Sequence, residues 1–167
     1  TTAEMASTFG EMLTFRRLQE TFKEPRIRLA MLCHKIEDTF ATVFRQVVMT
    51  RFEQLLHAAR REKGELTTEQ INELWLKANK PMHKGVIKLS PGYAWWWMYI
   101  GHFIRSPFYC YAYSYGELLV LALVQKYRQE GEAFVPKYLD LLASGGSDAP
   151  HVLLKKLDVD VNDPAFW

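Results

Sequence analysis

The amino-acid sequence predicts an all-α protein. Apolar residues recur at three- and four-residue intervals over most of the chain, and the longest such pattern runs from residue 27 to about residue 61. Glycine and proline separate the periodic segments, and only residues 86–89 also fit a short strand. With 167 residues, the chain is long enough for a single helical domain over residues 1–167, which would bury about 68–70 % of its unfolded surface.

Two helices are predicted in the amino-terminal part of the chain. Residues 3–18 have helical apolar spacing, and Glu4, Thr8 and Glu11 share one face of that helix. A break ending at Pro25 precedes residues 27–61, which we expect to form one amphipathic helix of about nine turns.

Shorter helices are predicted farther along the chain. Thr67 and Gln70 have the spacing of a capping box, which opens a helix through Trp75. The residues between Pro81 and Gly92 are expected to be a loop with at most a short strand at 86–89. Near the carboxy-terminal end, residues 138–142 and 150–157 are expected to be short helices on either side of a glycine- and serine-rich turn.

Residues 94–116 hold three tryptophans, five tyrosines and one histidine. Pro107 is expected in the first turn of a helix that continues to Tyr127, because a missing N–H costs nothing there. The run 118–124 is apolar on every side, so we expect this helix to enter the protein interior.

On that predicted helix, Tyr109, Tyr113 and Gly116 share one face and Tyr111 lies on the opposite face. Two interpretations are open. The tyrosines and His102 line a polar cleft, or they form an aromatic core whose hydroxyls reach the surface, since an unpaired buried hydroxyl costs about 1–3 kcal/mol.

Charge and composition exclude several classes of protein. The net charge of +2 gives no electrostatic case for nucleic acid or membrane surfaces, and no apolar run reaches the roughly 18 residues of a membrane span. The two cysteines, Cys33 and Cys110, are far apart and suit a reducing compartment, so we expect a cytoplasmic protein.

The residues of this chain do not contain a complete catalytic site. None of the five histidines has the HxxxH, HExxH or HxH spacing of a metal site, and we interpret His34 and His57 as structural. No phosphate-binding or serine-nucleophile motif occurs.

Four blocks, taken together, resemble oligoendopeptidase F and its relatives, the thimet-type zinc oligopeptidases. The blocks are residues 2–13, 43–53, 102–119 and 138–147, and their order and spacing agree over essentially the whole chain. The resemblance implies the multi-helix, carboxy-terminal part of the catalytic domain of a zincin-like oligopeptidase, which hydrolyses short peptides with one zinc ion.

The resemblance also implies residue roles. Glu4 matches the third zinc ligand, His102 the histidine that contacts the bound peptide, and Tyr113 the tyrosine that supports the developing oxyanion. Tyr109 is a second candidate for the oxyanion role, and Tyr111 is a further substrate contact. A zinc site with two histidines and one glutamate leaves a position open for water.

Thr8 and Glu11 are candidates to support Glu4 from its own helical face. All of these residues would have to face one shared hollow for the peptidase interpretation to hold.

This chain departs from the family pattern in two ways. The HExxH segment, which supplies two ligands and the general base, is absent, and Gly101 precedes His102 where a proline is expected. We therefore expect a carboxy-terminal fragment that is inactive without the missing amino-terminal part of the same polypeptide. The alternatives are a non-catalytic helical peptide-binding module and a structural domain whose tyrosines form its core.

Overall fold

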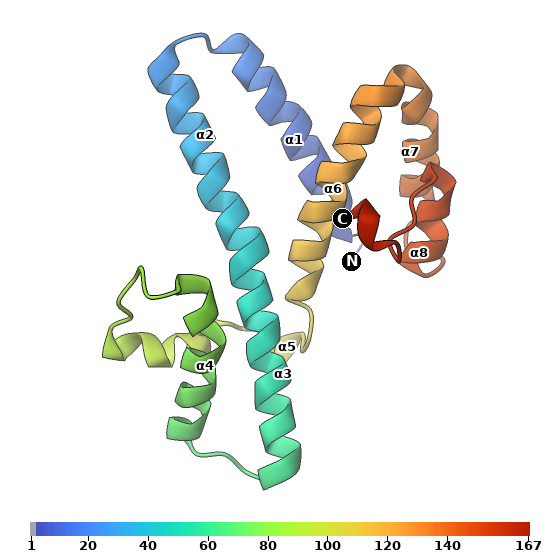
Figure 1. Ribbon diagram of the computed structural model, residues 1–167. Coiled ribbons are helices and arrows are strands. Elements are labelled where there is room, and N and C mark those ends of the chain that lie inside the picture. The colour runs from blue at the N-terminus through green and yellow to red at the C-terminus, as the bar shows by residue number, and fades with distance from the viewer. Residues whose placement is uncertain (1–2) are drawn as a thin grey trace. The chain divides into compact units, whose positions relative to one another are not determined.

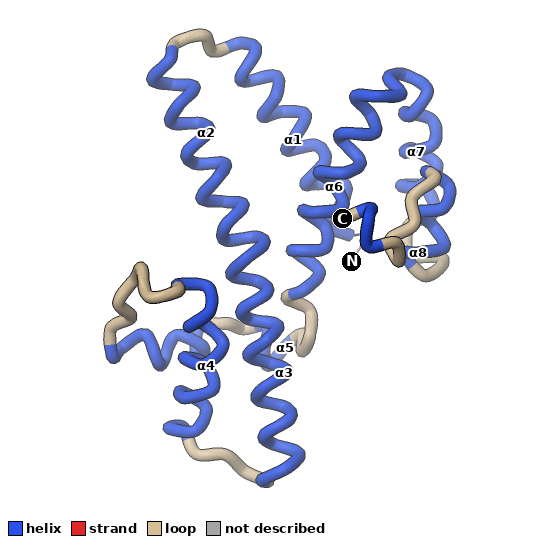
Figure 2. The backbone as a smooth tube through the Cα atoms, viewed as in Figure 1, coloured by secondary structure: helices blue, strands red, loops and turns tan. Residues whose placement is uncertain are grey.

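A computed structural model describes residues 3–167, and these residues form helices and loops without any strand (Figures 1 and 2). The all-α prediction is confirmed, whereas the optional strand at residues 86–89 is a turn and loop. The α-helices are α1 (Ala3–Thr21), α2 (Pro25–Thr39), α3 (Gln46–Lys63), α4 (Thr68–His83), α5 (His102–Arg105), α6 (Tyr111–Glu130), α7 (Phe134–Ser144) and α8 (Pro150–Leu153).

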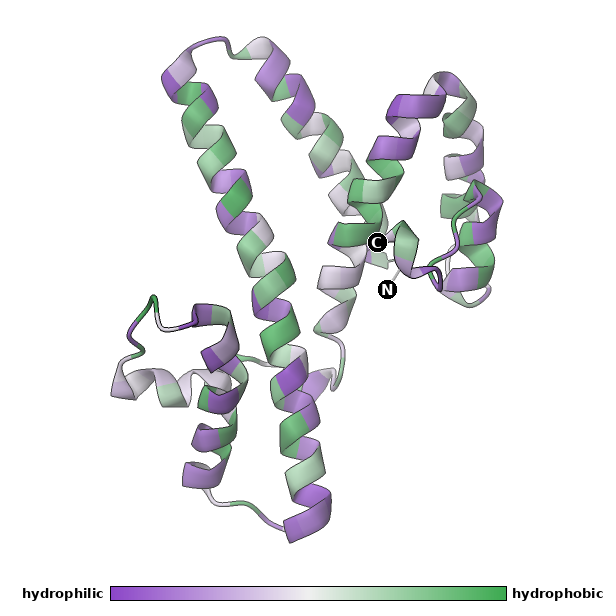
Figure 3. Cartoon of the chain, in the orientation of Figure 1, coloured by the Kyte–Doolittle hydropathy of each residue, from purple (hydrophilic) through white to green (hydrophobic). Residues whose placement is uncertain are grey.

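The long helix predicted at residues 27–61 is present, with one irregularity. Between α2 and α3 the chain continues as a π-helix, Phe40–Arg45, in which the Phe40 and Phe44 rings lie 4.9 Å apart. In a π-helix the backbone hydrogen bonds join residues five apart and not four, which apolar periodicity alone does not reveal. Hydrophobic and hydrophilic residues alternate along α2 and α3 in Figure 3, as expected for amphipathic helices.

The chain forms two compact units. Residues 3–39 and 115–167 form the first, here called the terminal unit, and residues 40–114 form the second, the central unit. The chain passes from one unit to the other within helical segments, near Thr39 and near Ser114. The single domain expected over residues 1–167 stays a prediction.

The terminal unit has a core built from α1, α6, α7 and the segment that follows α7. Phe9 of α1 stacks on Tyr138 of α7, with ring centroids 4.4 Å apart, and both pack with Leu119 and Leu123 of α6. Leu118, however, is 41 % exposed, so α6 is buried along one face and not on every side as its apolar run suggested.

The central unit has a second core in which aromatic rings join α3, α4 and α5. Phe52 is fully buried, and its ring lies 5.2 Å from that of Trp75 and 5.0 Å from that of Phe103. The capping box predicted at the start of α4 is confirmed, because the Gln70 N–H donates to Thr67 Oγ1 and the Thr67 N–H donates to Gln70 Oε1.

Most of the aromatic segment that begins near residue 94 belongs to the central unit. Pro91–Tyr99 is a 3-10 helix held on α4 by side-chain hydrogen bonds: Trp97 Nε1 donates to Asn72 Oδ1 over 2.7 Å. The helix expected to start at Pro107 begins instead at Tyr111, because residues 106–110 form a turn in which Phe108 has a φ of 60°.

The predicted short helices near the carboxy-terminal end are present but differ in extent. Residues 138–142 lie within α7, and residues 150–157 form α8 followed by the 3-10 helix Leu154–Leu157. A last 3-10 turn covers Pro164–Phe166. Within residues 3–167, no helix combines the length and apolar character that a membrane span requires.

Candidate active site

His102, Tyr109 and Tyr113 form one cluster in the central unit. His102 Nε2 lies 3.0 Å from the Tyr113 hydroxyl, which is hydrogen-bonding distance. The His102 ring stacks on the Tyr109 ring, with an interplanar angle of 9° and centroids 6.2 Å apart, and the two tyrosine rings meet edge to face at 5.5 Å. All three side chains are half-buried. The cluster therefore presents an imidazole and phenols that are neither fully solvated nor sealed in the core.

Local backbone structure brings these three residues together. His102 begins the four-residue helix α5, and the turn after α5 carries Tyr109, whose N–H donates to the Ser106 carbonyl. Tyr113 lies in the first turn of α6, which is fixed to the π-helix because the Ser114 hydroxyl lies 3.0 Å from the Val43 carbonyl. The predicted proximity of Tyr109 and Tyr113 is observed, although Tyr109 precedes the helix and does not share a helical face with Tyr113.

Tyr111 lies apart from this cluster. Its side chain is 47 % exposed, and none of the ring contacts in the described part of the chain joins it to His102, Tyr109 or Tyr113. Its role as a substrate contact stays a prediction.

Glu53 of α3 is a residue that sequence reasoning missed. Its side chain is fully buried, and its Oε1 accepts a hydrogen bond of 2.7 Å from the Phe108 N–H. Because Phe108 adopts a left-handed φ of 60°, this carboxylate holds the turn that carries Tyr109 in an unusual backbone conformation. A signal was available: Glu53 lies on the same helical face as Met49 and Leu56, where an apolar residue is expected.

Burial raises the pKa of the neighbouring Cys110 thiol to about 11, and the Glu53 charge contributes to that rise. Cys110 is fully buried at the end of the turn that carries Tyr109, so its thiol is held protonated and is a poor nucleophile there.

Glu4 lies in the first turn of α1, in the terminal unit, and is half-buried. Its backbone carbonyl accepts a hydrogen bond from the Ser7 hydroxyl over 3.1 Å. No group of three or more histidine, cysteine, aspartate or glutamate side chains in residues 3–167 is arranged to hold a metal. Glu4 carries a carboxylate, a donor type that zinc accepts, and its role as a metal ligand stays a prediction.

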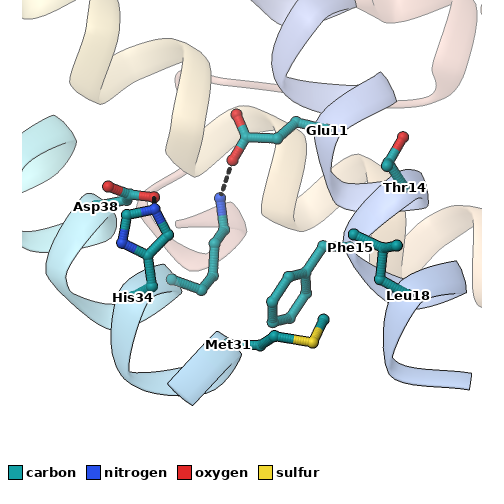
Figure 4. Close-up of a pocket in the computed structure, with 8 residues that line it drawn as sticks. Glu11, Thr14, Phe15, Leu18, Met31, His34 and Asp38 are labelled. Atoms are coloured by element: carbon teal, nitrogen blue, oxygen red, sulfur yellow. Dashed lines mark hydrogen bonds and ion pairs between the residues drawn. The ribbon is translucent and has the colours of Figure 1, made fainter. Parts of the chain in front are cut away.

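Thr8 and Glu11 continue the Glu4 face of α1, with Thr8 half-buried and Glu11 exposed. Lys35 Nζ of α2 lies 2.8 Å from Glu11 Oε1, and both residues line a hollow of about 280 Å³. Figure 4 labels Glu11 and draws its ion pair as a dashed line. Lys35 Nζ also lies 3.5 Å from Glu117 Oε1 of α6.

Burial alone would lower the pKa of Lys35, but the two carboxylates outweigh it and raise that pKa. Glu11 is thus engaged in an ion pair between helices. Its support of Glu4, like that of Thr8, stays a prediction.

His34 and His57, which the sequence indicated to be structural, lie outside the cluster. His34 is exposed and its Nε2 lies 3.5 Å from Asp38 Oδ2 one turn later in α2. The His57 ring packs 4.6 Å from the Phe108 ring.

Comparisons with known proteins identify the family. A protein-family model described as Peptidase family M3 matches residues 1–167. Oligopeptidase PepF of Bacillus subtilis is 33 % identical over 162 residues, which are 97 % of this chain and 24 % of that protein. The plasmid-encoded oligoendopeptidase F of Lactococcus lactis subsp. cremoris is 31 % identical over 164 residues, 98 % of this chain and 27 % of its own length.

A solved structure shows the same fold. The crystal structure of oligoendopeptidase-F from Enterococcus faecium superposes with a TM-score of 0.85 at 32 % identity, covering 98 % of this chain and 31 % of that one. The chain thus spans about a quarter of the length of the curated relatives it matches. The family match over its whole length confirms the resemblance read from the four sequence blocks, and the chain belongs to Peptidase family M3.

Proposed function

We propose that this chain is part of a zinc metallo-oligopeptidase that hydrolyses short peptides. Its membership of Peptidase family M3 and the names of its relatives, which are oligopeptidases and oligoendopeptidases, support the reaction class. The observation that carries the proposal is the hydrogen-bonding distance of 3.0 Å between His102 Nε2 and the Tyr113 hydroxyl. A half-buried phenol beside an imidazole is suited to stabilise a charged oxygen.

The tautomer of His102 decides what Tyr113 can do. When His102 Nε2 carries its hydrogen and donates it to Tyr113 Oη, the phenolic hydrogen of Tyr113 is directed away from His102. A donor aimed at an oxyanion is worth about 2.7–4 kcal/mol of barrier. Tyr109, stacked on His102, restricts the orientation of the imidazole and is the second candidate donor.

Glu4 is proposed as the carboxylate ligand of the zinc ion, with two histidine ligands outside this chain. A zinc ion held in this way lowers the pKa of a bound water to about 7 and so supplies a nucleophile. In this proposal the residues of this chain orient the peptide: His102 contacts the bound peptide, and Tyr111 is a further contact. We also propose that the chain alone binds zinc weakly and does not cleave peptides, since residues 3–167 hold no complete donor set.

Its partners would then be short peptides and the remainder of the same polypeptide. We propose a cytoplasmic location, which the free cysteines Cys33 and Cys110 support.

The test uses the complete protein that contains this chain. Tyr113→Phe should lower kcat for a short peptide by about 10²–10³-fold with zinc content unchanged, because it removes one oxyanion donor. Glu4→Ala should remove zinc and activity together. Tyr127→Phe is the matched control, since it deletes a phenol hydroxyl from the same helix outside the cluster.

Full activity in Tyr113→Phe, or stoichiometric zinc in Glu4→Ala, would overturn the corresponding assignment. Peptide binding without hydrolysis by the zinc-loaded complete protein would instead support the non-catalytic binding module.

A further inference from the structure

Two arginines of the central unit line a hollow beside the His102 cluster. Arg45 ends the π-helix and Arg105 ends α5, and both contribute to a cavity of about 370 Å³ that His102 also lines. No aspartate or glutamate is among its lining residues. The charged side chains that face this cavity are therefore all basic.

Neither guanidinium has a carboxylate partner in the described part of the chain. Arg45 is half-buried, and its guanidinium carbon lies 5.7 Å from the centroid of the Tyr99 ring, which also lines the cavity. The ring supplies a cation–π contact but no negative charge. A cation that is partly removed from water without a counter-ion favours the binding of an anion.

The Arg105 guanidinium lies close to the backbone in the lining of the same cavity. Its guanidinium packs so closely on Gly101 that a Cβ at residue 101 would clash with it. The glycine, which departs from the proline expected before His102, thus makes room for this arginine. Gly101 and Arg105 also line a smaller hollow of about 70 Å³ with His102, so both hollows have His102 and Arg105 in their linings.

We propose that Arg45 and Arg105 form a carboxylate-binding subsite for the peptide substrate. The inference rests on the proposed peptidase function, because it places a substrate group next to His102. Guanidinium groups match carboxylates in a planar, bidentate geometry, which a point charge such as lysine does not provide. The carboxylate is either the carboxy-terminal group of the peptide or an acidic side chain, and the two have the same chemistry at this subsite.

The test measures kcat/KM of the complete, zinc-loaded protein on three matched peptides. The first is a neutral peptide with a free carboxy-terminal acid, and the second is its carboxy-terminal amide. The third is a series of such amides, each with a single glutamate at a different position. The wild-type protein should prefer the acid, or one glutamate-containing amide, by about 10- to 100-fold over the neutral amide, mainly through KM. A preference for the acid identifies the terminal group, and a preference for one glutamate position identifies a side chain.

In Arg45→Gln and in Arg105→Gln the preference should fall to about threefold or less in each variant, while hydrolysis of the neutral amide stays within about twofold of wild type. Arg105 is exposed, so Arg105→Gln should leave the fold intact. This variant therefore still tests the subsite if replacement of the half-buried Arg45 destabilises the protein. Arg51→Gln is the matched control, because Arg51 lies on α3 and lines a different hollow. It should keep the full preference.

Several outcomes would overturn the subsite. The first is equal turnover of all three peptide types by the wild-type protein, and the second is a preference for the carboxylate that survives in both arginine variants. The third is inhibition by inorganic phosphate that both variants lose, combined with no effect of any peptide carboxylate on turnover. Failure of the proposed function is seen separately as an absence of hydrolysis of every peptide. In that case the equilibrium affinities of the labelled acid and amide still decide the subsite.

Discussion

Glu53 lies in an environment that is energetically unfavourable for a carboxylate. Its carboxylate is fully buried on α3, one oxygen accepts the Phe108 N–H, and the other oxygen, Oε2, has no hydrogen-bond partner in the described residues. A buried polar group of this kind is tolerated when it fixes a backbone that would otherwise relax. Here that backbone is the turn at Phe108, which places Tyr109 against His102.

Two replacements of Glu53 test the importance of its hydrogen bond to the Phe108 N–H. Glu53→Ala leaves the Phe108 N–H without an acceptor and should lower the free energy of unfolding by about 1–3 kcal/mol. Glu53→Gln keeps a carbonyl acceptor of the same size and should lose less than about 1 kcal/mol. Urea denaturation followed by tryptophan fluorescence measures both, and equal losses in the two variants would contradict the anchoring role.

The site residues show what a sequence can and cannot predict. His102 and Tyr113 were identified through a family resemblance, and the structure places them within hydrogen-bonding distance. Tyr109 was assigned for its helical face, but it meets Tyr113 through the turn that precedes α6. Glu53 was missed because a periodic pattern counts a charged residue as exposed and does not identify the backbone group, 55 positions away, that it binds.

At the scale of elements, the capping box of α4 is a feature that the sequence predicted correctly. Its hydrogen bonds are local, between Thr67 and Gln70, so residue identity at a fixed spacing is sufficient to predict it. The predicted start of α6 was wrong because it depends on a contact that is distant in sequence. Pro107 permits a helix start, but the tertiary bond from Phe108 to Glu53 keeps the chain in a turn until Tyr111.

Thr67→Ala should therefore destabilise the central unit by about 1 kcal/mol, within a range of about 0.5–2 kcal/mol, because the Gln70 N–H loses its cap. Thr68→Ala is the control, since Thr68 is an equally exposed threonine one residue into the helix without a capping bond. Its stability in thermal denaturation should stay close to wild type. A larger loss in Thr68→Ala would contradict the cap.

Lys35 of α2 connects its own helix to two others of the terminal unit. It pairs with Glu11 of α1 and with Glu117 of α6. The two carboxylates differ in burial, because the Glu117 side chain is 5 % exposed and that of Glu11 is 58 % exposed. Lys35→Met should cost about 3–5 kcal/mol, since it leaves the buried Glu117 without a counter-ion. Glu11→Gln should cost less than about 1 kcal/mol.

The comparison of these two variants by urea denaturation tests which carboxylate matters. The double variant Lys35→Met with Glu117→Leu should recover most of the loss, because an apolar pair of similar size replaces the ion pair. A single variant Lys35→Met as stable as wild type would show that water still reaches Glu117.

For the molecule as a whole, the sequence predicted which segments are helical better than it predicted which faces are buried. Leu29, Leu32 and Ile36 continue the apolar spacing of the long helix, yet they are 63 %, 40 % and 56 % exposed. Helical periodicity depends on spacing within one segment, whereas burial depends on which other segments cover it. The division into two units was likewise not predictable, because both passages between units lie inside helices without a linker composition.

Each unit contains a buried weak acid, Cys110 or Tyr138, whose pKa is raised by burial. Burial raises the pKa of the Cys110 thiol in the central unit from 9.0 to about 11, and that of the Tyr138 phenol in the terminal unit from 10.0 to about 12. Both groups are neutral in the folded protein and lose their protons more readily in the unfolded chain. Stability is therefore unaffected by these groups below about pH 9 and falls as the pH rises through each folded-state value.

The free energy of unfolding should fall over different pH ranges for the two groups. The fall should be on the order of 2 kcal/mol for Cys110 between pH 9 and 11, and of similar size for Tyr138 between pH 10 and 12. Cys110→Ala should flatten the first part of the curve of unfolding free energy against pH. Tyr138→Phe should flatten the second part, with little cost at neutral pH because the Tyr138 hydroxyl is buried without a hydrogen-bond partner in the described residues. Cys33→Ala is the control, since that thiol is exposed and its removal should leave the slope unchanged. If Cys110→Ala and wild type lose stability in parallel above pH 9, water reaches the Cys110 thiol and the core of the central unit opens at alkaline pH.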